Sequence, residues 1–197
     1  ALKNIGFLIV REKYPDDYKN ITLVFNDVDT MPFSKNFIPY QTEPGRVKHF
    51  YGFKFTLGGI VSIMGQDFEK INGFPNFWAW GYEDNMLNDR VKNMNMIIDR
   101  STFFPFADKN ILHFYDGYLK QVNKQEFERY ERGTREGIDS LFKVKYSVNK
   151  ETELIDITSF ETGTDENKRL THMHDLHNGT RPFVGRRRGG RGMSFFL

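Results

Sequence analysis

The chain has 197 residues and no cysteine, which excludes disulfide bonds and thiolate-bound metal sites. The absence of cysteine also favours a reducing compartment. No stretch comes close to the ~20 consecutive apolar residues of a membrane-spanning helix, and no signal-peptide pattern opens the sequence. From the sequence we therefore expect no membrane span and a cytoplasmic location for this cysteine-free chain.

Acidic residues are missing from residues 181–197, a segment that carries five of the 28 Lys and Arg residues. All 26 acidic residues precede it, so the net charge of +2 combines a slightly acidic body with a basic end. Residues 186–192, RRRGGRG, are typical either of an electrostatic contact with nucleic acid or of a solubilising terminus. We favour the solubilising terminus and expect no nucleic-acid partner.

Aromatic residues are abundant: the chain holds 20 Phe and 9 Tyr, and 39% of its residues are hydrophobic. This composition is typical of a packed core and not of a disordered chain. After residue 150 the sequence turns polar and then Arg/Gly-rich. We therefore predict a folded part over residues 1–150 and a C-terminal extension over residues 151–197.

Hydrophobic periodicity predicts that helices and strands alternate along the folded part. The predicted helices cover residues 2–10, 66–71 and 83–94, and the predicted strands cover residues 21–25, 50–55, 60–64 and 111–115. The proline-rich residues 30–46 are expected to be irregular. This alternation, with acidic residues at strand ends, predicts an α/β domain that binds its ligands at the carboxyl ends of strands.

Residues 24–32, VFNDVDTMP, place Asp27 and Asp29 directly after a predicted strand, where residues two apart point to one side. Such a pair fits a hard oxygen site for Mg²⁺ or Mn²⁺ that phosphate and water oxygens complete. It also fits a strand-to-loop turn in which the side chain of Asp27 makes local hydrogen bonds. The pair alone leaves both interpretations open.

A second cluster occupies residues 78–85, WAWGYEDN, where Glu83 and Asp84 open a predicted helix. Acidic residues in a first turn stabilise a helix by ~0.3–1 kcal/mol through its dipole, which is a sufficient structural reason for both. Aromatic rings beside carboxylates also suit a sugar-binding cleft, because rings stack on C–H faces while acids bind hydroxyls.

Histidine occurs in two settings that fit a metal ligand. His113 lies in the predicted strand of residues 111–115, three residues after Asn110, and fits either a core residue or a ligand. His172, His174 and His177 have metal-like spacing, but their stretch is polar and lacks cysteine, and we expect no metal there.

The order and spacing of three segments resemble those of the β-1,4-galactosyltransferase family: VFNDVDTMP, TLGGIVSIMGQDFEKINGFPNFWAWGYEDN and EGIDSLFKVKYSV. The most specific part is INGFPN followed by a Trp-Gly-x-Glu-Asp run. The resemblance covers residues 2–148 and assigns residues 1–150 to a galactosyltransferase-like catalytic part.

The resemblance implies a GT-A fold, in which helices flank a mixed sheet, and Mn²⁺-dependent, inverting transfer of a hexose from a UDP-sugar. The implied acceptor is a sugar hydroxyl of a glycan or glycoconjugate. In the family, nucleotide-binding strands precede the equivalent of Leu2, so we expect a fragment, a degenerate version or a site that another segment completes. The family also implies the Golgi lumen, in contrast to the compartment that the absent cysteines favour.

Carried over residue by residue, the resemblance assigns the metal to Asp29, His113 and Asn110, and the catalytic base to Asp84. Asn110 stands where the family has a methionine. Because an amide oxygen is harder than a thioether, we expect Mg²⁺ to be accepted as well as Mn²⁺. Asp84 lies near a helix N-terminus and is expected to keep a low pKa.

The other implied contacts divide between donor and acceptor. The donor is implied to contact Asp27, Asp29, Gly58, Gly59, Trp80 and Thr56, and the acceptor to contact Glu83, Asn85, Tyr82 and Phe77. Asn85 stands where the family has an acid, so the resemblance does not determine the identity of the acceptor. Thr56 replaces a family aromatic residue, and we expect this smaller side chain to admit UDP-N-acetylgalactosamine as well as UDP-galactose.

The sequence thus predicts a metal-dependent glycosyltransferase of carbohydrate metabolism. The alternative is a non-catalytic carbohydrate-binding or interaction fragment derived from such an enzyme. These two classes differ in whether metal and UDP bind together.

Overall fold

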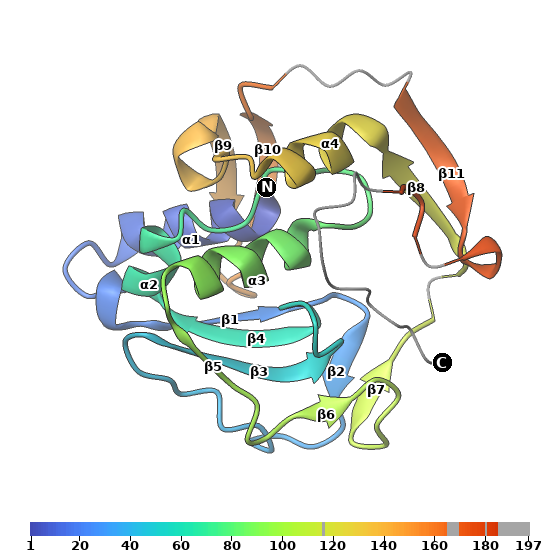
Figure 1. Ribbon diagram of the computed structural model, residues 1–197. Helices are drawn as coiled ribbons and strands as arrows, with labels where there is room; N and C mark the ends of the chain where they lie inside the picture. The colour runs from blue at the N-terminus through green and yellow to red at the C-terminus, as the bar shows by residue number, and fades with distance from the viewer. Residues whose placement is uncertain (116, 165–169, 180, 185–197) are drawn as a thin grey trace.

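The computed structural model describes residues 1–115, 117–164, 170–179 and 181–184 (Figure 1). The helices are α1 (Leu2–Lys13), α2 (Gly65–Lys70), α3 (Glu83–Asn93) and α4 (Lys124–Arg132), with short 3₁₀ turns η1 (Tyr18–Asn20), η2 (Ile138–Ser140) and η4 (Leu176–Asn178). The strands are β1 (Thr22–Asn26), β2 (Thr30–Pro32), β3 (Arg46–Gly52), β4 (Ile60–Met64), β5 (Ile97–Asp99), β6 (Phe104–Pro105), β7 (Ile111–His113), β8 (Leu119–Asn123), β9 (Phe142–Val148), β10 (Ile155–Glu161) and β11 (Thr171–Asp175).

A mixed sheet in the order β1-β4-β3-β5 forms the centre of the molecule, and β6 also pairs with β3. β4 runs antiparallel to both neighbours, whereas β3 runs parallel to β5 and β6. Every residue of β4 is buried, as expected for a central strand covered on both faces. The pairing of Asn26 with Ile60 brings the end of β1 to the start of β4. This mixed sheet with its helices confirms the predicted α/β class.

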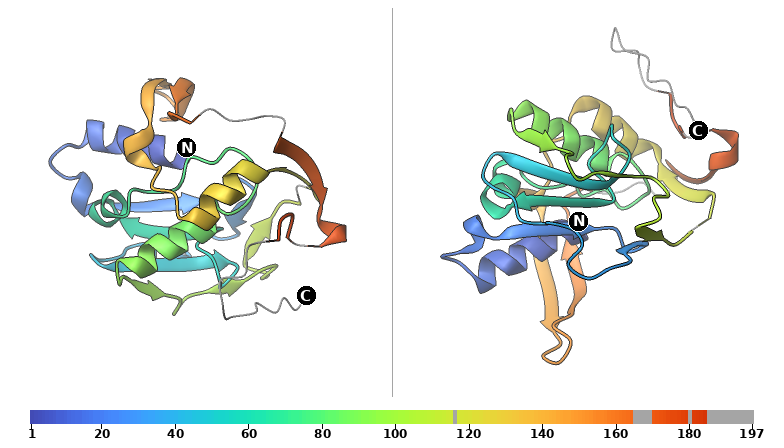
Figure 2. Two further views of the ribbon diagram at one scale, coloured as in Figure 1. Left: turned by 45° about the horizontal axis from the view of Figure 1, so that its top comes forward. Right: turned by 90° about the horizontal axis from the view of Figure 1, so that it is seen from below.

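Helices cover both faces of the sheet, with α1 on one side and α3 and α4 on the other (Figure 2). The Phe7 ring of α1 packs edge to face on Phe68 of α2 at 5.3 Å, and Phe68 contacts Phe25 of β1 at 4.6 Å. Leu87 and Val91 of α3 belong to the same core. Burying each such side chain stabilises the fold by ~1.5–3 kcal/mol, which fixes the helices on the sheet.

Three antiparallel strand pairs lie outside the central sheet: β2 with β7, β8 with β11, and β9 with β10. The hairpin of β9 and β10 spans residue 150, and the division of the chain at that residue stays a prediction. Within the described ranges, no helix is both long and apolar enough to cross a membrane.

Two local predictions need correction. Residues 30–46 are not wholly irregular, because Thr30–Pro32 forms β2 against β7. The strand predicted over residues 50–55 begins at Arg46 and ends at Gly52, whose φ of +122° is one that L side chains rarely adopt. The next residues form a turn, in which Thr56 N–H donates to Phe53 O at 3.1 Å.

Candidate active site

The end of β1 is bonded to the turn that precedes β4. Asp27 N–H donates to Gly59 O, and Gly59 N–H donates to Asp27 Oδ2, both at 2.9 Å. The ammonium group of Lys3, at the start of α1, donates to Asp27 Oδ1 at 2.7 Å. Both carboxylate oxygens of Asp27 therefore have partners, and these partners hold the side chain in one position.

The preceding residue of this turn, Gly58, lies against Asp84 of α3. A Cβ atom at Gly58 would lie 2.0 Å from Asp84 Oδ2, so only glycine leaves room for that carboxylate. Leu57 N–H donates to Asp84 O at 3.2 Å. Tyr82, just before the helix, has a left-handed backbone with φ 72°, which turns the chain into α3. We call Lys3, Asp27, Gly58, Gly59 and Asp84 the carboxylate half of the site.

The electrostatics of Asp84 differ from the sequence prediction. Burial raises the pKa of Asp84 well above its ordinary value, the charge of Glu83 raises it further, and Lys3 opposes both effects. The prediction of a low pKa is therefore wrong, because desolvation outweighs the favourable field of the helix N-terminus. Asp84 Oδ1 and Glu83 Oε2 are buried and accept no hydrogen bond within the described part of the chain. A bound ligand could supply the missing donors.

Asp29 and His113 face each other across the short pair of β2 and β7. Thr30 is the register partner of His113, and Phe114 N–H donates to Asp29 O at 2.7 Å. Asp29 Oδ2 lies 3.5 Å from His113 Nε2, which is long for a hydrogen bond and short enough for both atoms to bind one ion. The Tyr51 hydroxyl lies 2.8 Å from His113 Nδ1 and fixes the ring. We call Asp29, Tyr51 and His113 the metal half of the site.

The side chains present fit a divalent metal as a partial ligand set. A carboxylate oxygen and an imidazole nitrogen both suit Mn²⁺, and phosphate and water oxygens could fill its other positions. No group of three Asp, Glu or His side chains that could hold an ion occurs among the described residues. Asn110 Nδ2 donates to Asp108 Oδ1 at 2.9 Å, and no hydrogen bond joins Asn110 to the side chain of Asp29 or His113 in this part of the structure.

His49 connects the two halves from inside the core. Its Nε2 lies 2.9 Å from Tyr51 O and 3.0 Å from Gly58 O, and its side chain is fully buried. Arg100 Nε donates to His49 Nδ1 at 3.0 Å, so Nε2 carries the proton and donates to the two carbonyls. Burial and the charge of Arg100 lower the pKa of His49 to about 4. The ring is therefore neutral at pH 7.

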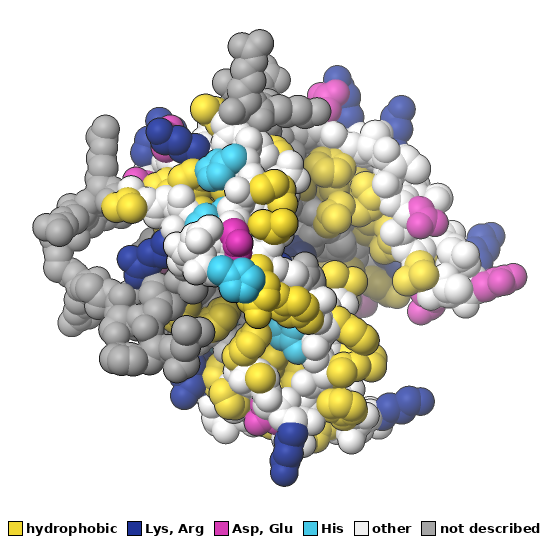
Figure 3. Space-filling view, turned by 90° about the vertical axis from the view of Figure 1, so that its right-hand side faces the viewer, with side chains coloured by type: hydrophobic (Ala, Val, Ile, Leu, Met, Phe, Trp, Pro, Cys, Tyr) yellow, Lys and Arg dark blue, Asp and Glu magenta, His cyan; other side chains and the backbone are white. Residues whose placement is uncertain are grey.

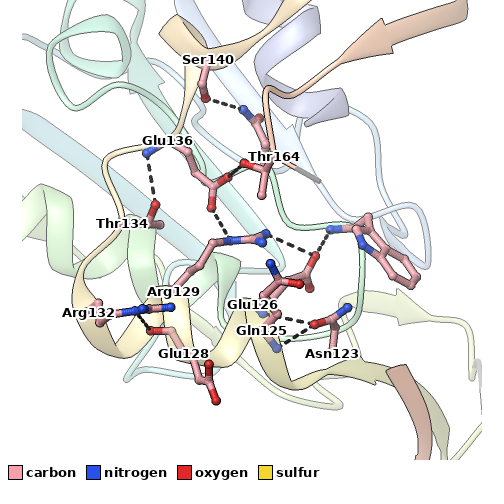
Figure 4. A network of polar contacts seen from close by, with 12 residues as sticks. Asn123, Gln125, Glu126, Glu128, Arg129, Arg132, Thr134, Glu136, Ser140 and Thr164 are labelled. Atoms are coloured by element: carbon pink, nitrogen blue, oxygen red, sulfur yellow. Dashed lines mark hydrogen bonds and ion pairs between the residues drawn. The ribbon is translucent and has the colours of Figure 1, made fainter. Parts of the chain in front are cut away.

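A side chain of α4 binds the backbone of the aromatic segment that leads to α3. Glu126 is 2% exposed and accepts hydrogen bonds from Trp78 N–H at 2.7 Å and from Ala79 N–H at 3.1 Å. Arg129 lies between Glu126 and Glu136, and its Nε donates to Glu136 Oε1 at 3.1 Å (Figure 4). A buried, paired carboxylate thus fixes the backbone of the tryptophan segment.

The side chains of this segment point to different surroundings. Trp78 and Trp80 are 45% and 40% exposed, so both can stack on a ligand. Phe77 is buried under the guanidinium of Arg129, and Tyr82 stacks on a tyrosine of α4 with ring centroids 5.2 Å apart. The half-buried Asn85 lies in the first turn of α3. Acceptor contacts at these positions stay predictions.

Exposed aromatic rings border the metal half. Figure 3 shows hydrophobic side chains gathered around histidines on the side of the molecule that carries β7, β8 and β11. Phe53 stacks on Phe55 and Phe106, with ring centroids 5.4 and 5.5 Å apart, and Phe106 contacts His113 edge to face at 4.9 Å. This rim offers apolar faces beside the candidate metal ligands.

The three histidines near the C-terminus each have a different partner. His174 Nε2 lies 2.7 Å from a backbone carbonyl, His177 Nδ1 lies 2.8 Å from Asp175 Oδ1, and His172 packs edge-on against a phenylalanine ring. Their metal-like spacing in the sequence therefore does not produce a metal-binding cluster among the described residues.

Sequence reasoning missed the residues that hold the site together: Lys3, His49, Tyr51 and Arg100. None of them belongs to a motif, and the contacts of Lys3 with Asp27, Tyr51 with His113 and Arg100 with His49 join residues 24 to 62 apart along the chain. The only signal for Lys3 was a positive charge in the first turn of a predicted helix, a place where cations are unfavourable. That anomaly indicates a nearby anion, which the structure identifies as Asp27.

The fold is similar to that of a Drosophila β-1,4-galactosyltransferase 7 mutant crystallised with manganese, UDP-Gal and xylobiose. The TM-score is 0.61 at 19% identity, and the match covers 82% of this chain and 73% of that one. The catalytic domain of the same Drosophila enzyme with xylobiose gives a TM-score of 0.57 at 20% identity. This likeness shows that the chain has a GT-A-type fold.

The sequence comparisons narrow the class to a family. Residues 46–116 match the family described as the N-terminal domain of galactosyltransferase. Mouse β-1,4-galactosyltransferase 5 is 32% identical over 157 residues, which cover 75% of this chain and 39% of that protein. Mouse β-1,4-galactosyltransferase 7 is 28% identical over 167 residues, covering 78% of this chain and 48% of that protein. The chain belongs to the β-1,4-galactosyltransferase family, and it spans less than half the length of these relatives.

Proposed function

We propose that this chain carries the catalytic site of a metal-dependent, inverting hexosyltransferase that moves a sugar from a UDP-sugar to a sugar hydroxyl. The observation that carries the proposal is the convergence of Asp27, Asp29, Asp84 and His113 on the edge of the sheet where β1 ends. The manganese and UDP-Gal bound by the solved Drosophila relative support it.

Asp84 is the proposed base, because its carboxylate lies at the start of α3 with one buried oxygen that lacks a donor. An acceptor hydroxyl bound there would donate a hydrogen bond and then give its proton to the carboxylate. For this Asp84 must be ionised: burial and the charge of Glu83 raise its pKa, and the charge of Lys3 opposes them. The exposed ring of Trp78 would orient the acceptor by stacking on its sugar faces, and the exposed Trp80 would contact the donor.

Asp29, His113 and Asn110 would hold the metal, and a bound divalent ion would neutralise the charge that develops on the departing diphosphate. Tyr51 keeps the imidazole of His113 turned toward Asp29. The oxygen-rich set predicts that Mg²⁺ substitutes for Mn²⁺.

Thr56 supports a finer proposal about the donor. Its side chain is 7% exposed and its hydroxyl donates to Phe53 O at 3.3 Å, so it adds no bulk to the surface of the site. We expect UDP-N-acetylgalactosamine to be used as well as UDP-galactose. Turnover measured with both donors under one set of conditions tests this, and a strong preference for galactose would contradict it.

The test of the proposed function is transfer from UDP-[³H]galactose to sugar acceptors with Mn²⁺, for the chain and for Asp84→Asn. The amide cannot accept the proton, so turnover should fall about 100- to 10,000-fold while UDP binding persists. Asp89→Asn is the matched control, since it changes an exposed acid on the same helix. Undiminished activity of Asp84→Asn would remove Asp84 from the role of base.

A non-catalytic carbohydrate-binding fragment is the second candidate. It is favoured by the exposed tryptophans, which can stack on sugars without a metal or a nucleotide. Such a fragment would bind sugars without binding metal and UDP together. A rise in melting temperature that requires both Mn²⁺ and UDP would support the enzyme instead.

A further inference from the structure

Lys3 is a cation placed among the carboxylates of the site. Its Nζ lies 2.7 Å from Asp27 Oδ1 and 4.9 Å from the centroid of the Phe74 ring. Burial opposes its charge, but the charges of Asp27, Asp84 and Glu83 together raise the pKa of Lys3 above its ordinary value. Lys3 is therefore a charged member of this cluster and does not point away into solvent as most surface lysines do.

The start of α1 is fixed, so Lys3 is held in place. The neighbouring Asn4 is fully buried and bonds the backbone of Phe74 twice: Asn4 Nδ2 donates to Phe74 O at 2.7 Å, and Phe74 N–H donates to Asn4 Oδ1 at 2.9 Å. The same amide nitrogen bonds Asn76 Oδ1 at 2.9 Å. These bonds attach the first turn of α1 to the segment that leads to the tryptophans.

Contacts run without a gap from Lys3 to Asp84. Lys3 binds Asp27, Asp27 exchanges two hydrogen bonds with Gly59, and the adjoining Gly58 is in contact with the Asp84 carboxylate. Without the ammonium, Asp27 would keep its like-charged neighbours and lose the cation that compensates for them. Mutual repulsion would then push Asp27 and Asp84 apart.

We propose that Lys3 is a positioning residue of the transferase site, which binds Asp27 and thereby keeps the Gly58–Gly59 turn seated against Asp84. The inference rests on the proposed function, in which Asp84 is the base. Lys3 acts through Asp27 and Asp84 and need not touch either substrate.

The first test measures kinetics of Lys3→Met, Lys3→Arg and the control Lys13→Met, which removes an exposed lysine at the other end of α1. We expect Lys3→Met to lower kcat about 100-fold, because the base and the turn beside it are displaced. Lys3→Arg should restore most of kcat, and Lys13→Met should equal the parent. A folded Lys3→Met variant with parental kcat would overturn the proposal.

The second test does not depend on activity. The ¹³C resonance of the Asp84 carboxyl, assigned by its loss in Asp84→Asn, is titrated in the substrate-free chain. The charged groups facing it are Glu83, Lys3 and Asp27. Lys3→Met should move the midpoint to higher pH, whereas Asp27→Asn, which removes a negative charge, should move it to lower pH.

These readouts separate the two proposals. If the parent chain transfers no sugar, the proposed function fails, yet the titration still shows whether Lys3 and Asp84 are coupled. Equal midpoints in the parent and Lys3→Met overturn the role of Lys3 whatever the activity. If Lys3→Met does not fold, an unshifted midpoint in Asp27→Asn overturns it in the same way.

Discussion

The carboxylate half and the metal half of the site are held by different kinds of contact. In the carboxylate half, Asp27 is fixed at both oxygens and Asp84 is packed against Gly58 with no space between them. In the metal half, Asp29 and His113 sit on a pair of three-residue strands, and their side chains stay 3.5 Å apart. The first half is fixed by close contacts, whereas the side chains of Asp29 and His113 in the second half are held less closely.

This difference indicates where each half is vulnerable. The carboxylate half depends on close packing, so a single added atom should disrupt it. The metal half depends on ligand orientation, so loss of one outer hydrogen bond should weaken it by a moderate factor. His49 touches both, since its ring bonds the carbonyls of Tyr51 and Gly58.

Gly58→Ala should have the largest effect. The added methyl would lie 2.0 Å from Asp84 Oδ2, so the Asp84 carboxylate, the turn or the start of α3 must move, and each of these displaces the proposed base. We expect transfer activity to fall at least about 100-fold and stability to fall by ~1–3 kcal/mol, measured by the sugar-transfer assay and urea unfolding.

The matched control for this change is Gly6→Ala in α1, where nothing lies within 4 Å of the added methyl. Alanine there should keep the activity and stabilise the helix by ~0.5–1 kcal/mol. Full activity of Gly58→Ala would show that the two halves do not differ in packing as described.

Glu126→Ala should destabilise the tryptophan segment next to the carboxylate half. Trp78 N–H and Ala79 N–H would lose their acceptor in a buried place, which costs about 2–4 kcal/mol in the free energy of unfolding. Urea unfolding followed by tryptophan fluorescence measures the loss. Glu128→Ala, an exposed change on the same helix, should stay within about 0.5 kcal/mol. Equal losses in both variants would show that Glu126 does not hold the tryptophan segment.

His49 should make stability depend on pH. Its pKa is about 4 in the folded chain and near 6.5 when unfolded, so the unfolded state binds more protons between these values. Stability should therefore be complete above pH 6.5 and fall as the pH drops toward 4, by about 2 kcal/mol between pH 7 and pH 5.

The control for this pH dependence compares two histidine variants by urea unfolding at both pH values. His49→Gln removes the titrating group and should lose most of the pH 7 to pH 5 difference. His177→Gln, which alters an exposed histidine, should keep it. An unchanged difference in His49→Gln would assign the effect to other groups.

Sequence reasoning found the fold because its signals are local. The apolar run of β1, the helical spacing of α1 and the motif around Glu83 all lie within short windows. It also proposed Asp29, His113, Asp27 and Asp84 as site residues, and the structure brings them to one edge of the sheet in two groups.

What it could not find depends on pairing between distant segments. The low predicted pKa of Asp84 rested on the helix terminus alone, while the burial that raises the pKa comes from the fold around it. Strand β2 escaped detection because three residues carry no periodicity and its partner β7 lies about 80 residues later. Lys3 was missed for the same reason, since its partner Asp27 lies 24 residues later, and so was the contact from Arg100 that sets the proton of His49.

Tyr51→Phe should have the smallest effect, and it tests the metal half by itself. The change deletes the hydroxyl that lies 2.8 Å from His113 Nδ1, while Asp29 and the imidazole remain. Because an outer hydrogen bond orients the ligand, we expect Mn²⁺ affinity to fall about tenfold.

Electron paramagnetic resonance of free Mn²⁺ during titration measures this affinity. The control Tyr40→Phe, which removes a hydroxyl in the same small core, should leave the affinity unchanged. If Tyr51→Phe left Mn²⁺ affinity unchanged, either the ligands would be held more tightly than their 3.5 Å separation indicates or His113 would not be one of them.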